Sequence, residues 1–170
     1  MERLFFALWP DDVTRARIEA ARLGAGMHDG RAIPTGNLHV TLVFLGALDR
    51  AQRLCTECAA AAIDARAFEL VLDEVQWRRR AGMVWLAATQ TPAALLDVVG
   101  ALQQALVACG YRSERRAFTA HVTLARDVRR APRGGAIVPI RWRANEFCLV
   151  RSEPTARGSA YTVERRWRLG

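Results

Sequence analysis

Two of the three histidines in this 170-residue chain lie in the same four-letter word, HVTL, which occurs twice. His39 and Thr41 belong to the first copy, and His121 and Thr123 belong to the second, 82 positions later. In an extended strand alternate side chains share a face, so the histidine and threonine of each copy would point the same way, about 7 Å apart. The valine and leucine of each copy would point to the opposite face, into a core.

Two histidines and two threonines facing one cleft could cleave a phosphodiester. Hydrolysis needs a base to take a proton from water and an acid to protonate the leaving oxygen, and histidine can fill either role near neutral pH. Threonine hydroxyls can donate hydrogen bonds to the non-bridging phosphate oxygens. One such pair alone would be read as a half-buried strand histidine, but the identical repeat favours a catalytic site.

Other kinds of catalytic site fit the sequence less well. Zinc would need at least a third ligand, and the only other histidine, His28, lies in a segment typical of an exposed helix end. The G-x-S-x-G turn that carries many nucleophilic serines is missing from the sequence. The sequence therefore predicts a reaction carried by the two histidines, with no metal and no cofactor.

The elements around the two motifs mix strands and helices without a strict β-α-β alternation. Hairpin-like neighbours are frequent, which favours an α+β fold with antiparallel sheet in a single domain, residues 1–170. Each HVTL strand follows a helix and a loop, so the chain reads as two similar halves. Strands are expected at residues 3–9, 38–46, 68–77, 82–89, 120–128, 136–142, 145–153 and 160–169, and helices at 11–27, 49–65 and 92–110.

Composition and cysteine usage bear on the compartment in which the protein is expected to function. Hydrophobic residues make up 51% of the chain, enough for a core, yet no apolar run approaches the roughly 20 residues of a membrane span. The opening MERLFFALWP is too short, and too soon followed by Asp11 and Asp12, for a signal peptide. Cys55 and Cys58, in an alanine-rich helical stretch, read as buried small side chains, and no disulfide framework is expected. These features predict a cytoplasmic protein with no membrane partner.

The basic residues are all arginine, 25 of them, and they are unevenly placed. Residues 1–110 carry a net charge of −1, from 11 arginines and 12 acids, whereas residues 111–170 carry +9, from 14 arginines and 5 acids. A basic half suggests a phosphate-bearing partner such as RNA. Codon bias and an ordinary solvated arginine face are the alternative explanation.

The paired motifs and their surroundings resemble the 2H phosphoesterases, and within them the RNA 2′,3′-cyclic phosphodiesterases, historically called 2′-5′ RNA ligases. The resemblance runs nearly end to end, through RLFFALWP, NLHVTLVFLG, FTAHVTLAR, LVRSE and GSAYTVERRWRL. Many relatives have proline before the second histidine, where this chain has Ala120. The resemblance implies a bilobal α+β fold, with two antiparallel sheets and flanking helices around a central cleft. It also implies metal-independent hydrolysis of a terminal 2′,3′-cyclic phosphate of RNA to a 2′-phosphomonoester.

The resemblance assigns roles to the motif residues by position. His39 would be the general acid and His121 the general base, while Thr41 and Thr123 would hold the phosphate. Arg126, two residues beyond the second motif, would add a cation near the phosphate, unless it is a surface arginine at a strand end.

Two aromatic residues flank the motifs, Phe44 and Phe118. They could stack on a base of the substrate, although core packing is an equal alternative. The reaction itself also has alternatives: a phosphodiesterase of small cyclic nucleotides or 2′-5′-linked oligonucleotides, an RNA 2′-5′ ligase, or an RNA-binding module without catalysis. Both histidines are present, which argues against the last. A monomer that hydrolyses RNA ends is the leading expectation.

Overall fold

The order of strands and helices along the chain is close to the one that the sequence predicts, and the last four elements are consecutive strands. The structure, a computed structural model, describes residues 1–112, 117–156 and 158–170. The strands in these ranges are β1 (Glu2–Leu8), β2 (Arg31–Ala32), β3 (Val40–Leu48), β4 (Phe68–Arg78), β5 (Met83–Ala87), β6 (His121–Arg126), β7 (Gly135–Ala144), β8 (Glu146–Thr155) and β9 (Gly158–Arg168). The helices are α1 (Asp12–Gly24), α2 (Arg50–Ala61) and α3 (Ala93–Leu106), with short 3-10 turns η1 (Thr35–Asn37), η2 (Arg79–Ala81) and η3 (Val107–Cys109).

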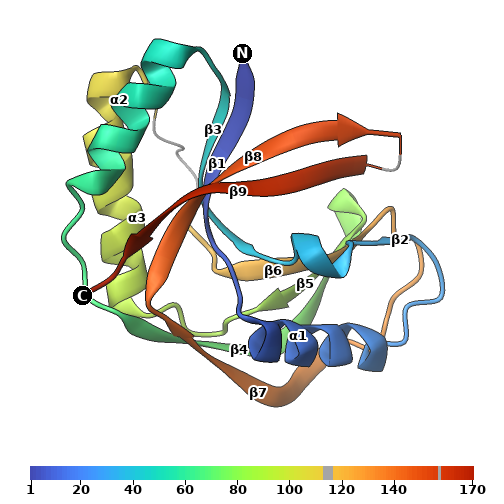
Figure 1. Ribbon diagram of the computed structural model, residues 1–170. Helices are drawn as coiled ribbons and strands as arrows, with labels where there is room; N and C mark the ends of the chain where they lie inside the picture. The colour runs from blue at the N-terminus through green and yellow to red at the C-terminus, as the bar shows by residue number, and fades with distance from the viewer. Residues whose placement is uncertain (113–116, 157) are drawn as a thin grey trace.

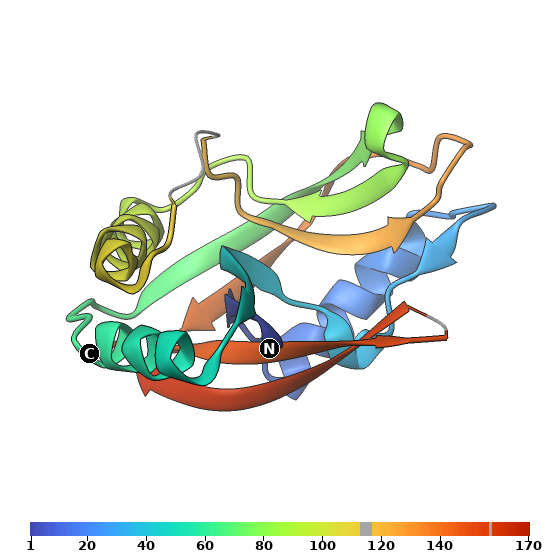
Figure 2. The same ribbon diagram turned by 90° about the horizontal axis from the view of Figure 1, so that it is seen from above.

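All the strand pairs described are antiparallel, which confirms the predicted α+β class. The strand order is β7-β4-β5-β6-β3-β1-β8-β9, with β2 added beside β6. The nine strands form one sheet, where the resemblance implies two. The two groups of strands that carry the motifs are continuous with each other because β3 pairs with β6 at Val40 and Val122. Figure 2 shows β4, β5 and β6 in one layer and β8 and β9 in the other.

The strand β1 is buried on both faces, which explains its apolar sequence. Leu4, Phe6 and Leu8 belong to the main core, whereas Phe5 and Ala7 point to the other face and form a small second cluster with β8. Because successive strand residues point to opposite faces, a strand buried on both sides reads as a continuous apolar run. The second cluster lies beside His39, since the Phe5 ring is 4.9 Å from the imidazole between centroids.

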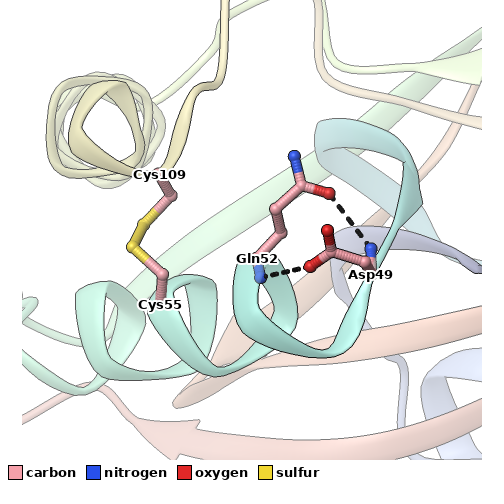
Figure 3. Close-up of a disulfide and its surroundings, with 4 residues drawn as sticks. All are labelled: Asp49, Gln52, Cys55 and Cys109. Atoms are coloured by element: carbon pink, nitrogen blue, oxygen red, sulfur yellow. Dashed lines mark hydrogen bonds between the residues drawn. A yellow bond between two sulfur atoms is a disulfide. The ribbon is translucent and has the colours of Figure 1, made fainter.

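The helices α1 and α2 begin where the sequence offers capping residues. The Asp11 carboxylate accepts a hydrogen bond from the Thr14 amide at the start of α1. At the start of α2, Asp49 and Gln52 exchange hydrogen bonds in a capping box (Figure 3). Such caps satisfy amide groups that have no partner within the helix. The helices α2 and α3 then lie side by side at one end of the molecule (Figure 1).

The cysteine expectation was wrong. Cys55 of α2 and Cys109 of η3 form a disulfide (Figure 3), Cys58 is exposed, and only Cys148 is a buried thiol. The C-x-x-C spacing relates Cys55 to Cys58, but the disulfide partner of Cys55 is 54 residues away in the sequence. The packing of α2 against α3 brings the two cysteines together. Because disulfides are rare in reducing compartments, cysteine usage no longer supports the cytoplasmic assignment.

One expected loop contains a short strand, and one expected strand is longer than predicted. The expected loop at residues 30–37 contains the short strand β2, which pairs Arg31 with Arg126 and Ala32 with Ala125 beside the second motif. The strand β3 continues past Gly46, whose positive φ of 78° suits glycine, as far as Leu48.

Across the described residues, no helix combines the length and the apolar character needed to cross a membrane.

Candidate active site

The two HVTL motifs meet where the two groups of strands join. His121 is the first residue of β6, His39 immediately precedes β3, and the two strands pair antiparallel at Val40 and Val122. In an antiparallel pair this register, extended by one residue, sets His39 opposite Thr123 and His121 opposite Thr41. The valines are buried, so the histidines and threonines share the opposite face.

Both histidines are held in the same tautomer by the backbone. Nδ1 of His39 is 2.6 Å from the carbonyl oxygen of Asn37, and Nδ1 of His121 is 2.8 Å from that of Thr119. A carbonyl oxygen can only accept, so each Nδ1 carries the proton and donates. The other nitrogen, Nε2, is then an unprotonated acceptor in each neutral ring, and that of His39 lies 3.0 Å from the Thr41 hydroxyl.

The predicted site residues line two adjoining cavities. His39, Thr41, Phe44, Thr123 and Arg126 line the first, which we call the phosphate cavity. The second, which we call the aromatic cavity, is lined by His121, by four aromatic side chains, and by polar and aliphatic neighbours that include Thr41. The aromatic residues are Phe44, Trp85, Tyr111 and Phe118. Thr41 and Phe44 belong to both cavities.

The two flanking phenylalanines differ in their surroundings. Phe44 is 45% exposed, so core packing does not account for it. Phe118 is half-buried and packs partly against the main core, while it also lines the aromatic cavity. Both rings can therefore present a face or an edge to a ligand.

Each histidine is stacked on a tryptophan that sequence reasoning missed. The Trp85 and His121 rings lie 3.7 Å apart between centroids and 17° from parallel, and the Trp9 and His39 rings lie 5.6 Å apart and 15° from parallel. An arginine guanidinium lies over each indole, that of Arg78 over Trp85 at 4.8 Å and that of another arginine, Arg15, over Trp9 at 5.7 Å. The site thus repeats an arginine–tryptophan–histidine stack as well as a motif.

Burial favours the neutral form of both histidines. It lowers the pKa of His39 to about 4, against an opposing effect of the Asn37 carbonyl, and the nearby His121 and Arg126 lower it further. Burial also lowers the pKa of His121, with the Thr119 carbonyl opposing and Arg78 adding to the decrease. Near neutral pH both rings are neutral in the ligand-free protein, so each Nε2 can accept a proton.

This burial predicts that acid destabilises the fold through His39. Between pH 6.5 and 4 the unfolded chain binds a proton at this histidine and the folded chain does not, so stability falls as the pH falls. The free energy of unfolding should drop by about 2 kcal/mol between pH 7 and pH 5 from this group. Urea unfolding at both pH values measures the drop, and His39→Gln should lose most of it. An equal drop in both proteins would contradict the assignment.

Other residues of the phosphate cavity could not be singled out from the sequence. Asn37, Ser152 and Tyr161 line it, and the Tyr161 ring meets the His39 ring edge to face at 5.2 Å between centroids. The Asn37 side-chain amide donates to the Ser159 carbonyl at 2.7 Å, which ties η1 to β9. These residues come from three separate segments, and no local spacing relates them.

The arginines at the cavities do not come mainly from the basic half of the chain. Four arginines of that half form ion pairs with glutamates: Arg141, Arg151, Arg165 and Arg166. Three more, Arg115, Arg116 and Arg157, lie outside the described residues. Arg126 lines the phosphate cavity, and it lines a neighbouring cavity together with Arg3 and Arg31 of the other half.

The structure offers no alternative metal centre within its described ranges. No group of three or more His, Cys, Asp or Glu side chains there is arranged to hold a metal ion. His28 is exposed in the loop after α1 and lines neither cavity.

Comparison with known proteins places the chain in a family. Residues 9–156 match the model of the 2′-5′ RNA ligase superfamily. The chain is 30% identical to the RNA 2′,3′-cyclic phosphodiesterase of Escherichia coli, over 99% of this chain and 97% of the relative. It is 29% identical to the protein of the same name from Thermus thermophilus, over 98% and 90%.

Solved structures agree with the sequence comparison. The E. coli protein LigT, solved with 3′-AMP, superposes with a TM-score of 0.88 at 31% identity, over 99% of this chain and 98% of that one. A protein described only as a phosphoesterase gives the same TM-score at 29% identity, with the same coverage. The family match covers most of the chain and includes both motifs, which confirms the resemblance drawn from them: this chain belongs to the 2′-5′ RNA ligase superfamily of 2H phosphoesterases.

Proposed function

We propose that this protein hydrolyses the 2′,3′-cyclic phosphate at the end of an RNA strand and leaves a 2′-phosphomonoester. The single observation that carries the proposal is the pair of histidines with matched tautomers, each with Nδ1 fixed to a backbone carbonyl. Two such groups supply the acid and the base that the reaction needs. The names of the full-length relatives, RNA 2′,3′-cyclic phosphodiesterase, support the substrate class.

His121 is proposed as the general base. Its Nε2 takes a proton from a water molecule as the water oxygen attacks phosphorus. Because its pKa is lowered by burial, the ring is neutral and able to accept this proton near neutral pH. The carbonyl of Thr119 then stabilises the imidazolium through the Nδ1–H bond.

His39 is proposed as the general acid. Its protonated Nε2 gives a proton to the 3′ oxygen as the bond from phosphorus to that oxygen breaks, so the phosphate remains on the 2′ oxygen. With a pKa near 4 the ring is neutral in the free protein, and the anionic phosphate must raise this pKa before the ring can act as an acid. Thr41, Thr123 and Arg126, which line the same cavity, would bind the phosphate oxygens.

The decisive experiment is incubation with an oligonucleotide that ends in a 2′,3′-cyclic phosphate, with the product identified by phosphorus NMR. In-line attack places the water opposite the leaving oxygen, so the orientation of the ribose between the two histidines selects the product. A single 2′-phosphate is expected. A clean 3′-phosphate would reverse the proposed orientation, and no hydrolysis at all would overturn the function in favour of RNA binding.

The same assay tests whether a metal takes part. Because the two histidines supply both proton transfers, activity should be unchanged after dialysis against excess EDTA. The measurement is the initial rate before and after this treatment, with zinc or manganese added back in parallel. A loss that either metal restores would contradict the proposed mechanism.

A further inference from the structure

We propose a second phosphate-binding subsite in this protein, formed by Arg3, Arg31 and Arg126, which holds the 5′-phosphate of the nucleotide whose cyclic phosphate is opened. The inference rests on the proposed function and adds to it a preference for substrates that carry this phosphate. The three arginines line a cavity of about 340 Å³, which we call the basic cavity.

The basic cavity is a direct extension of the phosphate cavity. The two share six lining residues: Ile33, Asn37, Phe44, Arg126, Ser152 and Tyr161. A ligand held beside His39 can therefore continue into the basic cavity without leaving the protein surface. Arg126 stands in the shared wall, so it can reach groups in either cavity.

The chemistry of the basic cavity suits an anion. Three arginines line it, together with the hydroxyl-bearing Ser152 and Ser159, and none of its described lining residues is acidic. Guanidinium groups bind phosphate oxygens through charge-assisted hydrogen bonds. A cavity with this lining would bind a phosphate more readily than a base or a sugar.

The fold positions two of these arginines. The Arg3 guanidinium, at the start of β1, lies over the Phe44 ring at 5.9 Å from its centroid. Arg31, in β2, packs against Gly158 at the start of β9, where a Cβ would overlap its guanidinium. Gly158 has a φ of 130°, a conformation that glycine alone adopts easily. The absence of a side chain at Gly158 therefore leaves space for Arg31 at the wall of the basic cavity.

The shape of the substrate selects which phosphate enters. From a ribose that carries a 2′,3′-cyclic phosphate, only the base and the 5′-phosphate lead away. The aromatic cavity, with Trp85, Tyr111 and Phe118, shares residues with the phosphate cavity and suits a base. The basic cavity also shares residues with the phosphate cavity, and its arginines suit the 5′-phosphate.

The acidic residue Asp127 can compete with an anion for this subsite. The carboxylate of Asp127 is 3.6 Å from the Arg31 guanidinium, and both side chains are at least half exposed. Exposed pairs of this kind contribute little to stability, so a phosphate can displace or share the contact. Removal of the Asp127 charge should therefore strengthen anion binding at Arg31, an effect opposite to that of losing an arginine.

The test compares two product-like probes, adenosine 2′-monophosphate and adenosine 2′,5′-bisphosphate, which differ by one 5′-phosphate. We expect the bisphosphate to bind about tenfold more tightly by titration calorimetry at low salt. Arg3→Ala and Arg31→Ala should each reduce this ratio severalfold toward one. Asp127→Asn, compatible with the positive φ of that position, should increase the ratio about twofold.

The matched control is Arg66→Ala, which removes the same charge from the loop between α2 and β4. Its neighbours Ala65 and Ala67 are hydrogen-bonded to Gly170, the C-terminal residue. The C-terminus lies on the opposite side of the molecule from β2 (Figures 1 and 2). The ratio should be unchanged in this variant. Equal binding of the two probes to the parent protein, or an equal loss of ratio in Arg66→Ala and Arg31→Ala, would overturn the subsite.

Rates separate this inference from the function on which it rests. Adenosine 2′,3′-cyclic phosphate and its 5′-phosphorylated form should both be hydrolysed, with kcat/KM about tenfold higher for the latter. Hydrolysis of both at the same kcat/KM would contradict the subsite alone. Failure to hydrolyse either would contradict the function, and the binding ratio of the two product-like probes would still decide the subsite.

Discussion

Replacement of either motif histidine with alanine should reduce hydrolysis of a 2′,3′-cyclic phosphate by roughly 10²–10⁴-fold. Each change removes one proton transfer, because the ring lost is the only histidine in its cavity. The double variant His39→Ala with His121→Ala should be little worse than the single variants, since groups that act in one step are not additive. Initial rates on a cyclic nucleotide measure all three.

The control for these variants is His28→Ala, which should retain the full rate because this histidine is exposed and lines neither cavity. Melting temperatures should show that the alanine variants remain folded. A folded His39→Ala or His121→Ala variant with the rate of the parent would refute the two-histidine mechanism.

A substrate with a better leaving group can tell the acid from the base. A p-nitrophenyl phosphodiester releases an oxygen that needs no proton, so loss of the general acid costs little on it. If His39 is the acid, His39→Ala should recover most of its rate on this substrate, while His121→Ala should stay impaired. The reverse pattern would exchange the two roles.

The common orientation of the histidine and the threonine in each motif could be predicted from the sequence because it follows a local rule. The alternation of side chains along a strand places the histidine and the threonine of each copy on one face, and this holds whatever the strand pairs with. The helices were also predictable, because capping residues such as Asp11 and Asp49 lie next to their first turns. Periodicity and caps act within a few residues, where the sequence can be read directly.

The rest of the site depends on register between distant strands. Trp85 reaches the candidate active site because β5 pairs with β6 so that Trp85 stands opposite Thr123. Arg31 reaches it because β2 pairs with β6 opposite Arg126. The disulfide depends in the same way on the packing of α2 against α3. A single sequence carries no direct signal of such pairings, so the stacked tryptophan, the basic cavity and the disulfide all required the structure.

The stacking of Trp85 on His121 leads to the second large expected effect. An indole 3.7 Å from the imidazole fixes the plane of the ring and keeps water from one of its faces. Trp85→Ala should let the ring tilt away from the line of attack, and a displacement of about 1 Å can cost about 10²-fold in rate. We expect kcat to fall by about that factor and KM to change much less.

The pKa of His121 gives a readout that a simple loss of stability would not move. Removal of the indole exposes the ring, so its pKa should rise toward the ordinary histidine value, because burial is the main cause of the decrease. Trp85→Phe should keep an aromatic face and therefore lie between the parent and the alanine variant in both kcat and pKa. NMR titration of the histidine ring protons measures the pKa in each protein.

The matched control is Trp77→Ala on the neighbouring strand β4. Trp77 packs against the main core and not against a histidine, and it stands opposite Val84, next to Trp85 in β5. This variant should lower the melting temperature and leave the pKa of His121 unchanged. If Trp77→Ala and Trp85→Ala reduce kcat equally, with the His121 pKa unmoved in both, then Trp85 supports only the fold. A fall in kcat and a rise in the His121 pKa, both confined to Trp85→Ala, would instead establish the indole as the group that positions this histidine for proton transfer.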